Sequence, residues 1–173
     1  GLEDISSGEL YIGENLVNDM QPKDRDIAMV FQNYALYPHM TVYENMAFGL
    51  TLRKVPRTEI HEKVMWAADV LGLTDYLDRK PKAMSGGQRQ RVGIARAMVI
   101  NPEVIIADEP ISALDVSIRA QVLNLIKEFQ KERQMTVVFI AHDLSVVKYI
   151  SDRIGVIYGG RLVELAEANR LFE

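Results

Sequence analysis

Two adjacent carboxylates, Asp108 and Glu109, follow the apolar run 104–107 and precede Pro110. An unbroken apolar run of this length predicts a strand buried on both faces, and ligands of parallel α/β sheets bind beyond the carboxyl ends of the strands. Neighbouring strand residues face opposite sides, so one carboxylate could orient Mg²⁺ and its waters while the other polarises an attacking water. Taken alone, the same residues also suit a solvated turn before a proline.

A second candidate is the segment Ser85-Gly86-Gly87-Gln88, which precedes a stretch with helical apolar spacing. Glycines let the backbone approach a ligand closely, and the free N–H groups of a helix N-terminus favour phosphate oxygens. Ser85 and Gln88 also have the spacing of a capping box. The segment therefore predicts either a phosphate contact or an ordinary capped helix start.

His142 and Gln32 each follow an apolar run of strand length. If the strand before His142 neighbours the strand 104–107, its imidazole lies at the same sheet edge as Asp108 and Glu109. A neutral imidazole there could hydrogen-bond a phosphate or the attacking water. The Gln32 amide could reach a metal-bound water. Each residue alone would equally suit a loop or a helix cap.

The elements that must position these residues follow two hydrophobic periods. Residues 41–52, 57–71 and 88–99 have helical spacing, and Thr41 with Glu44 gives a second capping-box pattern. Beyond residue 102, the apolar runs 104–107 and 136–141 predict two buried strands, alternating with amphipathic helices at 117–131 and 144–150. Shorter strands are predicted at 9–13 and 26–31, and Gly159-Gly160 predicts a hairpin turn between two more.

This order predicts an α/β fold. Two strands joined by a helix pair in parallel through a right-handed crossover. We expect residues 33–100 to form an all-helical subdomain, ending in the helix that follows Ser85. It would be inserted between two parts of the α/β core, residues 1–32 and 101–173.

Composition places the chain among ordinary globular domains. Its 173 residues suffice for one core, and its hydrophobic fraction of 48% and charged fraction of 25% are typical of such domains. A formal net charge of −4 argues against nucleic acid or an anionic membrane as the main partner. The absence of cysteine excludes disulfides and thiolate chemistry. No apolar run reaches the roughly 18 residues of a membrane span, so a membrane role would act through a partner chain.

The order of the motifs carries more information than any one of them. Gln32 ends a strand; Ser-Gly-Gly-Gln-Arg-Gln-Arg starts at Ser85, Asp-Glu-Pro at Asp108 and Ser-Ala-Leu-Asp at Ser112; a last strand ends before His142. Across essentially the whole chain, this layout closely resembles the nucleotide-binding domain of ATP-binding-cassette (ABC) transporters. The resemblance implies a P-loop NTPase-like parallel sheet core, ATP and Mg²⁺ as cofactors, and ATP hydrolysis coupled to transport.

By position in the motifs, the resemblance also implies roles for the candidate residues. Catalytic roles fall on Glu109 as the base, on His142 as the switch histidine and on Gln32 in the Q-loop. Asp108, in the Walker B motif, and Gln32 are implied to contact Mg²⁺. The implied cofactor-binding residues come from the signature motif, which contacts ATP held by the opposite domain, and from the D-loop: Ser85, Gly86, Gly87, Gln88 and Asp115.

The resemblance further implies two partners. One is a second ATPase domain in a head-to-tail dimer, and the other is the pair of transmembrane permease subunits of an importer. The implied location is cytoplasmic, peripheral on the inner face of the cell membrane through the permease. No nucleic-acid partner is expected. The transported substrate is selected by the other subunits.

One element of the family's pattern is absent from this sequence. No G-x-x-x-x-G-K-[ST] phosphate-binding loop occurs, and none of the eleven glycines is followed by Lys. That segment normally supplies a backbone nest and a Lys for the phosphates, together with a central strand of the sheet. We expect the α/β core to be incomplete at its N-terminal side, and ATP affinity and hydrolysis of this chain alone to be severely reduced.

The two halves resemble different importer types. Residues 31–42 look like the sugar-importer ATPases, whereas residues 108–117 and 140–147 look like the oligopeptide-importer ATPases. The change falls near residues 94–101. A natural intermediate, a reconstructed sequence and a chimera are all compatible with this pattern.

Two alternatives to a transporter ATPase remain at this stage. A DNA-repair-type ABC ATPase shares the signature, Walker B and switch elements, but carries long coiled-coil heptads where only about fifty residues separate Gln32 from Ser85 here. A catalytically silent scaffold is the other, because the phosphate loop is missing.

Overall fold

A parallel three-stranded sheet forms the centre of the molecule. The computed structural model describes residues 3–112 and 114–172. The strands β3 (Ile27–Val30), β4 (Val104–Asp108) and β5 (Thr136–Ile140) pair in the order β3-β4-β5. Both pairings are parallel, with Ile105 opposite Ala28 on one side and opposite Val137 on the other. The predicted parallel pairing is confirmed, and it aligns the carboxyl ends of all three strands.

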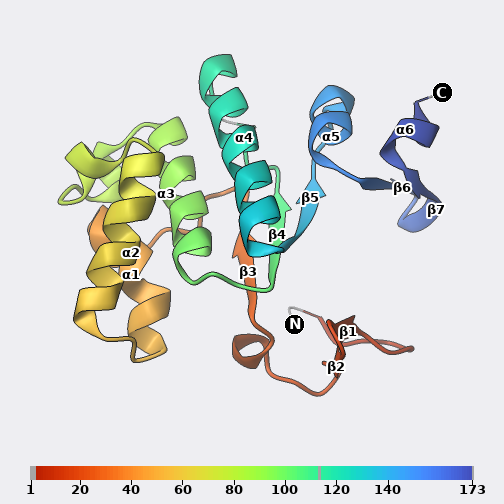
Figure 1. The fold of residues 1–173 in the computed structure, drawn as a ribbon, viewed down its shortest axis with the longest axis horizontal. Coiled ribbons are helices and arrows are strands. Elements are labelled where there is room, and N and C mark those ends of the chain that lie inside the picture. The colour runs from red at the N-terminus through yellow and green to blue at the C-terminus, as the bar shows by residue number, and fades with distance from the viewer. Residues whose placement is uncertain (1–2, 113, 173) are drawn as a thin grey trace.

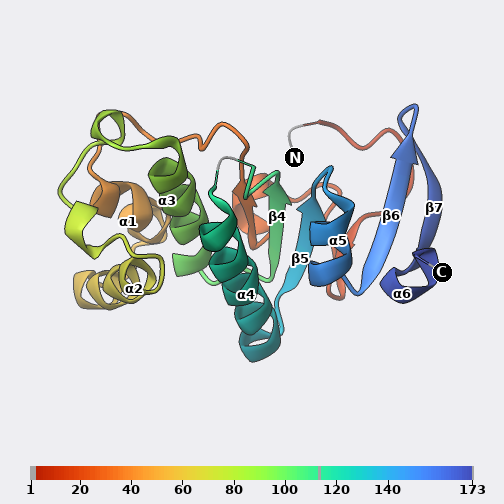
Figure 2. The ribbon, with the colours of Figure 1, turned by 90° about the horizontal axis from the view of Figure 1, so that it is seen from above.

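Helices gather at one end of this sheet (Figures 1 and 2). They are α1 (Val42–Leu52), α2 (Arg57–Val70) and α3 (Gly86–Val99), with the short 3-10 helices η2 (Thr74–Tyr76) and η3 (Pro81–Ala83) between α2 and α3. Thr41 caps α1 and Ser85 caps α3, each through the predicted capping box with Glu44 and Gln88. Because these caps satisfy backbone N–H groups that have no partner within the helix, they define where both helices begin.

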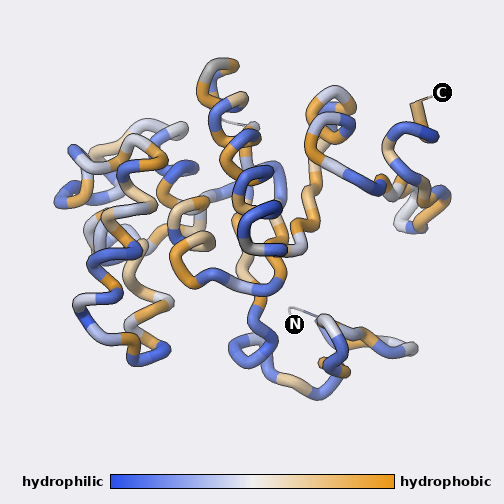
Figure 3. The backbone as a smooth tube through the Cα atoms, in the orientation of Figure 1, coloured by the Kyte–Doolittle hydropathy of each residue, from blue (hydrophilic) through white to orange (hydrophobic). Residues whose placement is uncertain are grey.

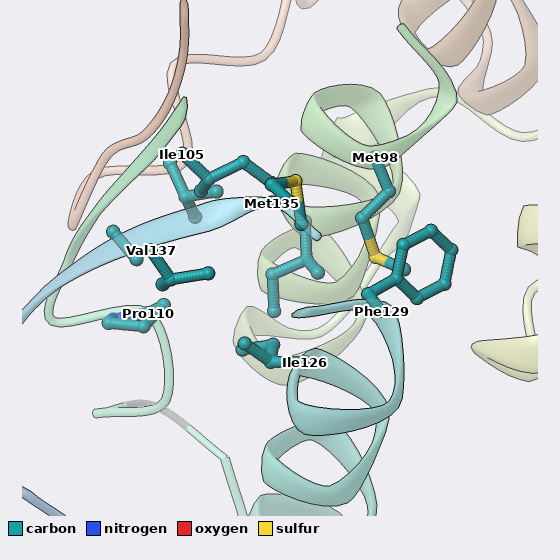
Figure 4. A pocket seen from close by; sticks show the side chains of 10 residues that line it. Met98, Ile105, Pro110, Ile126, Phe129, Met135 and Val137 are labelled. Carbon is teal, nitrogen blue, oxygen red and sulfur yellow. The ribbon is translucent and has the colours of Figure 1, made fainter. Parts of the chain in front are cut away.

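The main core extends from the packed faces of α1, α2 and α3 to the place where α3 and α4 (Val116–Arg133) cover the sheet. Figure 3 shows hydrophobic and hydrophilic residues alternating along these helices. A small apolar cavity of about 20 Å³ lies at this junction. Figure 4 shows Met98 of α3, Ile105 of β4 and Phe129 of α4 among the side chains that line it. Burial of this apolar surface supplies most of the stabilisation that fixes α3 and α4 on the sheet.

The strand β5 is not buried as its composition predicted. Its residues alternate between exposed and half-buried, and Val138 and Ile140 are 46% and 49% exposed. The prediction of a second buried strand at 136–141 is therefore wrong. The reason is that β5 pairs with β4 along only one edge among the described residues.

Beyond β5, the chain forms α5 (Leu144–Ile150) and a hairpin of β6 (Arg153–Tyr158) and β7 (Arg161–Glu167), followed by α6 (Ala168–Leu171). The predicted hairpin turn at Gly159-Gly160 is confirmed, and both glycines have positive φ. Near the other terminus are the hairpin of β1 (Tyr11–Ile12) and β2 (Asn15–Leu16) and the 3-10 helix η1 (Pro22–Asp24). Among the described residues, none of the helices has the length and apolarity to cross a membrane.

Candidate functional site

The carboxylate of Glu109 joins the carboxyl ends of all three central strands. Gln32, just beyond β3, donates its Nε2 hydrogen to Glu109 Oε2 at 2.8 Å. The Nδ1 atom of His142, just beyond β5, lies 3.0 Å from Glu109 Oε1. Gln32 and His142 are 77 and 33 positions from Glu109 in the sequence, and the three side chains meet at one point.

The chemistry of a carboxylate determines the direction of both bonds. An ionised carboxylate only accepts hydrogen bonds, so the Gln32 amide presents its nitrogen and the His142 ring carries a hydrogen on Nδ1. In the neutral ring, Nε2 is then left as an acceptor. The His142 side chain is 77% exposed and that of Glu109 only 26%, so the imidazole faces solvent above a partly shielded carboxylate.

The backbone at Glu109 is held in an unusual conformation. Its φ of 46° lies in the left-handed region, which non-glycine residues rarely adopt. Its N–H donates to the Ile140 carbonyl at 2.9 Å, and its carbonyl accepts from both the N–H and the hydroxyl of Ser112, at 3.3 and 3.1 Å. Such strained residues persist where the surroundings hold them, and they cluster at functional sites.

Asp108 is the last residue of β4 and is half-buried. Asp108 and the amide oxygen of Gln32 provide hard oxygen donors at the same sheet edge, the ligand type that Mg²⁺ prefers. Within residues 3–112 and 114–172, three or more His, Cys, Asp or Glu side chains do not gather into a metal cluster. A donor set with few carboxylates fits Mg²⁺ in phosphate-transfer sites, because the ion there is completed by waters and phosphate oxygens.

The signature residues lie elsewhere, at the start of α3. The Ser85 hydroxyl accepts from the Gln88 N–H at 3.2 Å, and the Gln88 side chain accepts from the Ser85 N–H at 2.9 Å. Gly86 lies close to the Tyr34 hydroxyl: a Cβ at position 86 would be 3.3 Å from it. None of the hydrogen bonds described for residues 85–88 leads to Glu109. Ser85 is exposed to solvent.

Asp115 precedes α4 at its N-cap position and is exposed, with no side-chain capping bond. Arg119 of α4 holds the turn before Asp115. Its guanidinium donates to the Leu114 carbonyl at 2.8 Å and to the Ser112 carbonyl at 3.4 Å. Ala113 lies outside the described residues. Asp115 is thus separated from the Glu109 cluster by a turn whose backbone is tied to α4.

Two residues of α3 contribute to this edge although sequence reasoning missed them. Gln90 is fully buried and donates its Nε2 hydrogen to the Glu109 carbonyl at 3.0 Å. Arg96 donates to the Ala35 and Tyr34 carbonyls, at 2.6 and 3.3 Å, and burial lowers the pKa of its guanidinium. A sequence signal for Gln90 existed: it stands four residues before Ile94 on the apolar face of α3, where a polar side chain requires a partner.

The fold and this edge define the class of protein. The ATP-binding cassette MJ0796, solved as a dimer in a post-hydrolysis state with ADP and Pi, superposes with a TM-score of 0.88 at 31% identity, over 96% of this chain and 76% of that one. A second dimeric structure of the same cassette gives a TM-score of 0.87. The molecule therefore has the α/β ABC cassette fold with a parallel sheet, as predicted.

The family follows from the sequence comparisons. The family model described as "ABC transporter" matches residues 1–112. This chain belongs to the ABC transporter family.

The curated relatives named here are import ATP-binding proteins. The oligosaccharides import ATP-binding protein MsmX of Bacillus subtilis is 50% identical over all of this chain and 47% of its own length. The trehalose/maltose import ATP-binding protein MalK of Thermococcus litoralis is 48% identical over all of this chain and 48% of its own length. The sn-glycerol-3-phosphate import protein UgpC of Ruegeria pomeroyi is 47% identical, again over the whole chain. The chain thus spans about half the length of the curated relatives it matches.

Proposed function

We propose that this chain forms the hydrolytic edge of an ATP site in a cassette that energises solute import. The observation that carries this proposal is the carboxylate of Glu109, held between Gln32 and His142 at the carboxyl ends of three parallel strands. A carboxylate held there can take a proton from an attacking water, and the two donors orient it for that task. Its partial burial limits competition from bulk water.

His142 and the metal-facing groups have separate tasks in this proposal. The exposed imidazole keeps its Nδ1 hydrogen on Glu109 and directs Nε2 to the phosphate end of a nucleotide or to the attacking water. Asp108 and the Gln32 amide oxygen would hold Mg²⁺ and its waters. The bound ion would neutralise charge that develops on the transferring phosphate.

The signature residues serve a second ATP site in this proposal. Ser85, Gly86, Gly87 and Gln88 lie on α3 away from the Glu109 cluster, so a contact to ATP held by an opposite domain agrees with their position. Free N–H groups at the start of α3 suit phosphate oxygens. We therefore propose a head-to-tail dimer of ATPase domains, with Asp115 contributing from the D-loop.

The phosphate-binding segment has a place that would receive it. A groove of about 700 Å³ lies between β5 and β6, lined by β5 residues 136–140 and by Ile154, Gly155 and Ile157 of β6. β5 presents its unpaired edge and its exposed Val138 and Ile140 to this groove. An added parallel strand would satisfy these backbone groups and cover this apolar surface. We propose that the strand before a phosphate-binding loop occupies the groove.

The finer assignment concerns transport. The relatives named above are sugar and glycerol-3-phosphate import proteins, and each matches the whole chain. This likeness supports an importer of the same kind. Such an importer would have permease partners and would place the chain on the inner face of the membrane. The oligopeptide-importer resemblance of residues 108–117 and 140–147 stays a prediction, as do the boundaries 1–32, 33–100 and 101–173.

Mg-ATP turnover of the cassette completed by an upstream phosphate-binding segment tests the proposal. We expect turnover by the completed cassette, and a loss of about 10²–10⁴-fold in kcat for Glu109→Gln, because the base is removed while the shape is kept. Glu128→Gln, the same change at an exposed position of α4, should leave kcat unchanged. Turnover that survives Glu109→Gln, or a completed cassette without turnover, would instead favour the scaffold.

A further inference from the structure

Gln90 is a fully buried polar side chain that links α3, the helix that begins with the signature motif, to the backbone of Glu109. It is 0% exposed, and its Nε2 atom donates to the Glu109 carbonyl at 3.0 Å. It lies on α3 five positions after Ser85, within one uninterrupted helix. A buried amide is costly unless it is hydrogen-bonded, so this bond is strongly favoured in the folded state.

The carbonyl that Gln90 binds belongs to a strained peptide. Glu109 has a φ of 46°, and its carbonyl also accepts from Ser112. The direction of the Glu109 side chain follows from this backbone conformation, since φ and ψ set the orientation of Cα–Cβ. A relaxation of φ to a negative value would move the carboxylate away from the positions where Gln32 and His142 reach it at 2.8 and 3.0 Å.

The same helix also holds the segment that follows Gln32. Arg96 binds the carbonyls of Tyr34 and Ala35, and both of these residues have positive φ, 65° and 42°. Both backbone segments that present the carboxylate cluster, one after β3 and one after β4, are therefore bonded to side chains of α3. A displacement of α3 would therefore shift both backbone segments.

We propose that Gln90 is a positioning residue that holds the backbone of Glu109 in its left-handed conformation. Through this bond, the position of α3 determines the direction in which the Glu109 carboxylate points. The inference rests on the proposed function, because it assigns Glu109 the role of base. In a dimer, the start of α3 would contact one nucleotide while Gln90 adjusts the carboxylate that acts on the other. Gln90 thus provides a physical link between the two sites through one helix and one hydrogen bond.

Gln90→Met in the completed cassette tests this role, because Met keeps the volume and removes the donor. We expect hydrogen exchange at the Glu109 N–H to rise about tenfold or more, because loss of the bond to the Glu109 carbonyl lets φ of Glu109 relax and weakens the bond from its N–H to the Ile140 carbonyl. We expect kcat to fall about tenfold while KM for ATP changes less than about twofold, since a misplaced base affects the chemical step. Gln121→Met, the same substitution at an exposed position of α4, should change neither measurement.

Several outcomes decide the matter. Unchanged exchange at Glu109 with unchanged kcat overturns the inference. Exchange that rises equally along β3, β4 and β5 also overturns it, because Gln90 would then only support the core. If Gln90→Met does not fold, Gln90→Asn keeps an amide one methylene shorter and should show the same local rise. A wild-type cassette without turnover defeats the proposed function instead, and the exchange measurement still decides the role of Gln90.

Discussion

The strands β4 and β5 have nearly the same apolar composition but different surroundings. On the face that carries Ile105 and Ala107 of β4, which are 6% and 1% exposed, the paired β5 residues Val137 and Phe139 are only half-buried. On the opposite face, Ile106 of β4 is half-buried, whereas Val138 and Ile140 of β5 are 46% and 49% exposed. β4 has a partner strand on each side and the helices α3 and α4 against it, as Figures 1 and 4 show. Within residues 3–112 and 114–172, β5 has a partner strand on one side only, and the 700 Å³ groove lies on the other. The difference teaches that burial is a property of the neighbours and not of the strand.

The functional edge spans both regions. Glu109 extends from the well-covered strand, and its N–H is bonded to Ile140 of the exposed one. His142 follows the exposed strand, so one of the two donors to the carboxylate depends on the less covered side. The aim of the carboxylate therefore depends on how well β5 is held beside β4.

The largest effect on this comparison is expected for Ile105→Ala on β4. The substitution enlarges the apolar cavity that Ile105 already lines, and an Ile→Ala change in a packed core costs about 2–5 kcal/mol of unfolding free energy. Urea denaturation followed by circular dichroism measures it. A loss below about 1 kcal/mol would mean that β4 is not packed as described.

The same substitution on the other strand, Ile140→Ala, should cost much less. About half of the side chain is already in contact with solvent, so we expect a loss of about 1 kcal/mol in this 173-residue chain. In a cassette whose groove is filled by an added strand, the loss should approach that of Ile105→Ala. Equal losses with and without the added strand would contradict the proposed occupant of the groove.

The smallest effect is expected at Asp143, which caps α5 beside the open edge. Its carboxylate accepts from the N–H groups of Val146 and Ser145, and these bonds hold the pKa of Asp143 below its usual value of 3.8. A depressed pKa contributes stability that is present above the ordinary pKa and is lost as the pH falls through the lowered one. Asp143→Ala should therefore lower Tm slightly at pH 7, and the difference from wild type should shrink below about pH 3.8.

The control for that measurement is the exposed Asp152→Ala, because the Asp152 carboxylate accepts from the Gln130 side chain at 3.4 Å and the substitution leaves the backbone carbonyl in place. Its effect on Tm should be smaller at pH 7 than that of Asp143→Ala. A difference between Asp143→Ala and wild type that stays constant from pH 7 to pH 3 would show that the capping carboxylate does not carry the effect.

Much of the fold follows from local sequence. The caps at Thr41 and Ser85 and the turn at Gly159-Gly160 depend on residues within four positions of one another, so their patterns predicted them. The helix α5 also begins and ends at its predicted residues, Leu144 and Ile150. The parallel pairing of β4 and β5 followed from the helix between them.

The site was only partly predictable. Motif order placed Gln32, Glu109 and His142 at the ends of three strands, but which atoms meet depended on the strand order β3-β4-β5. The place of Gln90 on the apolar face of α3 signals that its side chain needs a partner, but the sequence does not say which one, because the partner is a backbone carbonyl nineteen positions away. Backbone partners have no residue type, so no sequence pattern marks them.

The sequence by itself therefore determined the elements, their caps and the set of chemical groups at one edge of a parallel sheet. Only the tertiary structure decided that β5 has an open side, that Glu109 adopts a left-handed backbone, and that α3 holds this backbone through Gln90. The physical reason is range. Caps, turns and periodicity are interactions over a few residues, whereas burial and strain depend on surfaces that meet only when distant segments pack.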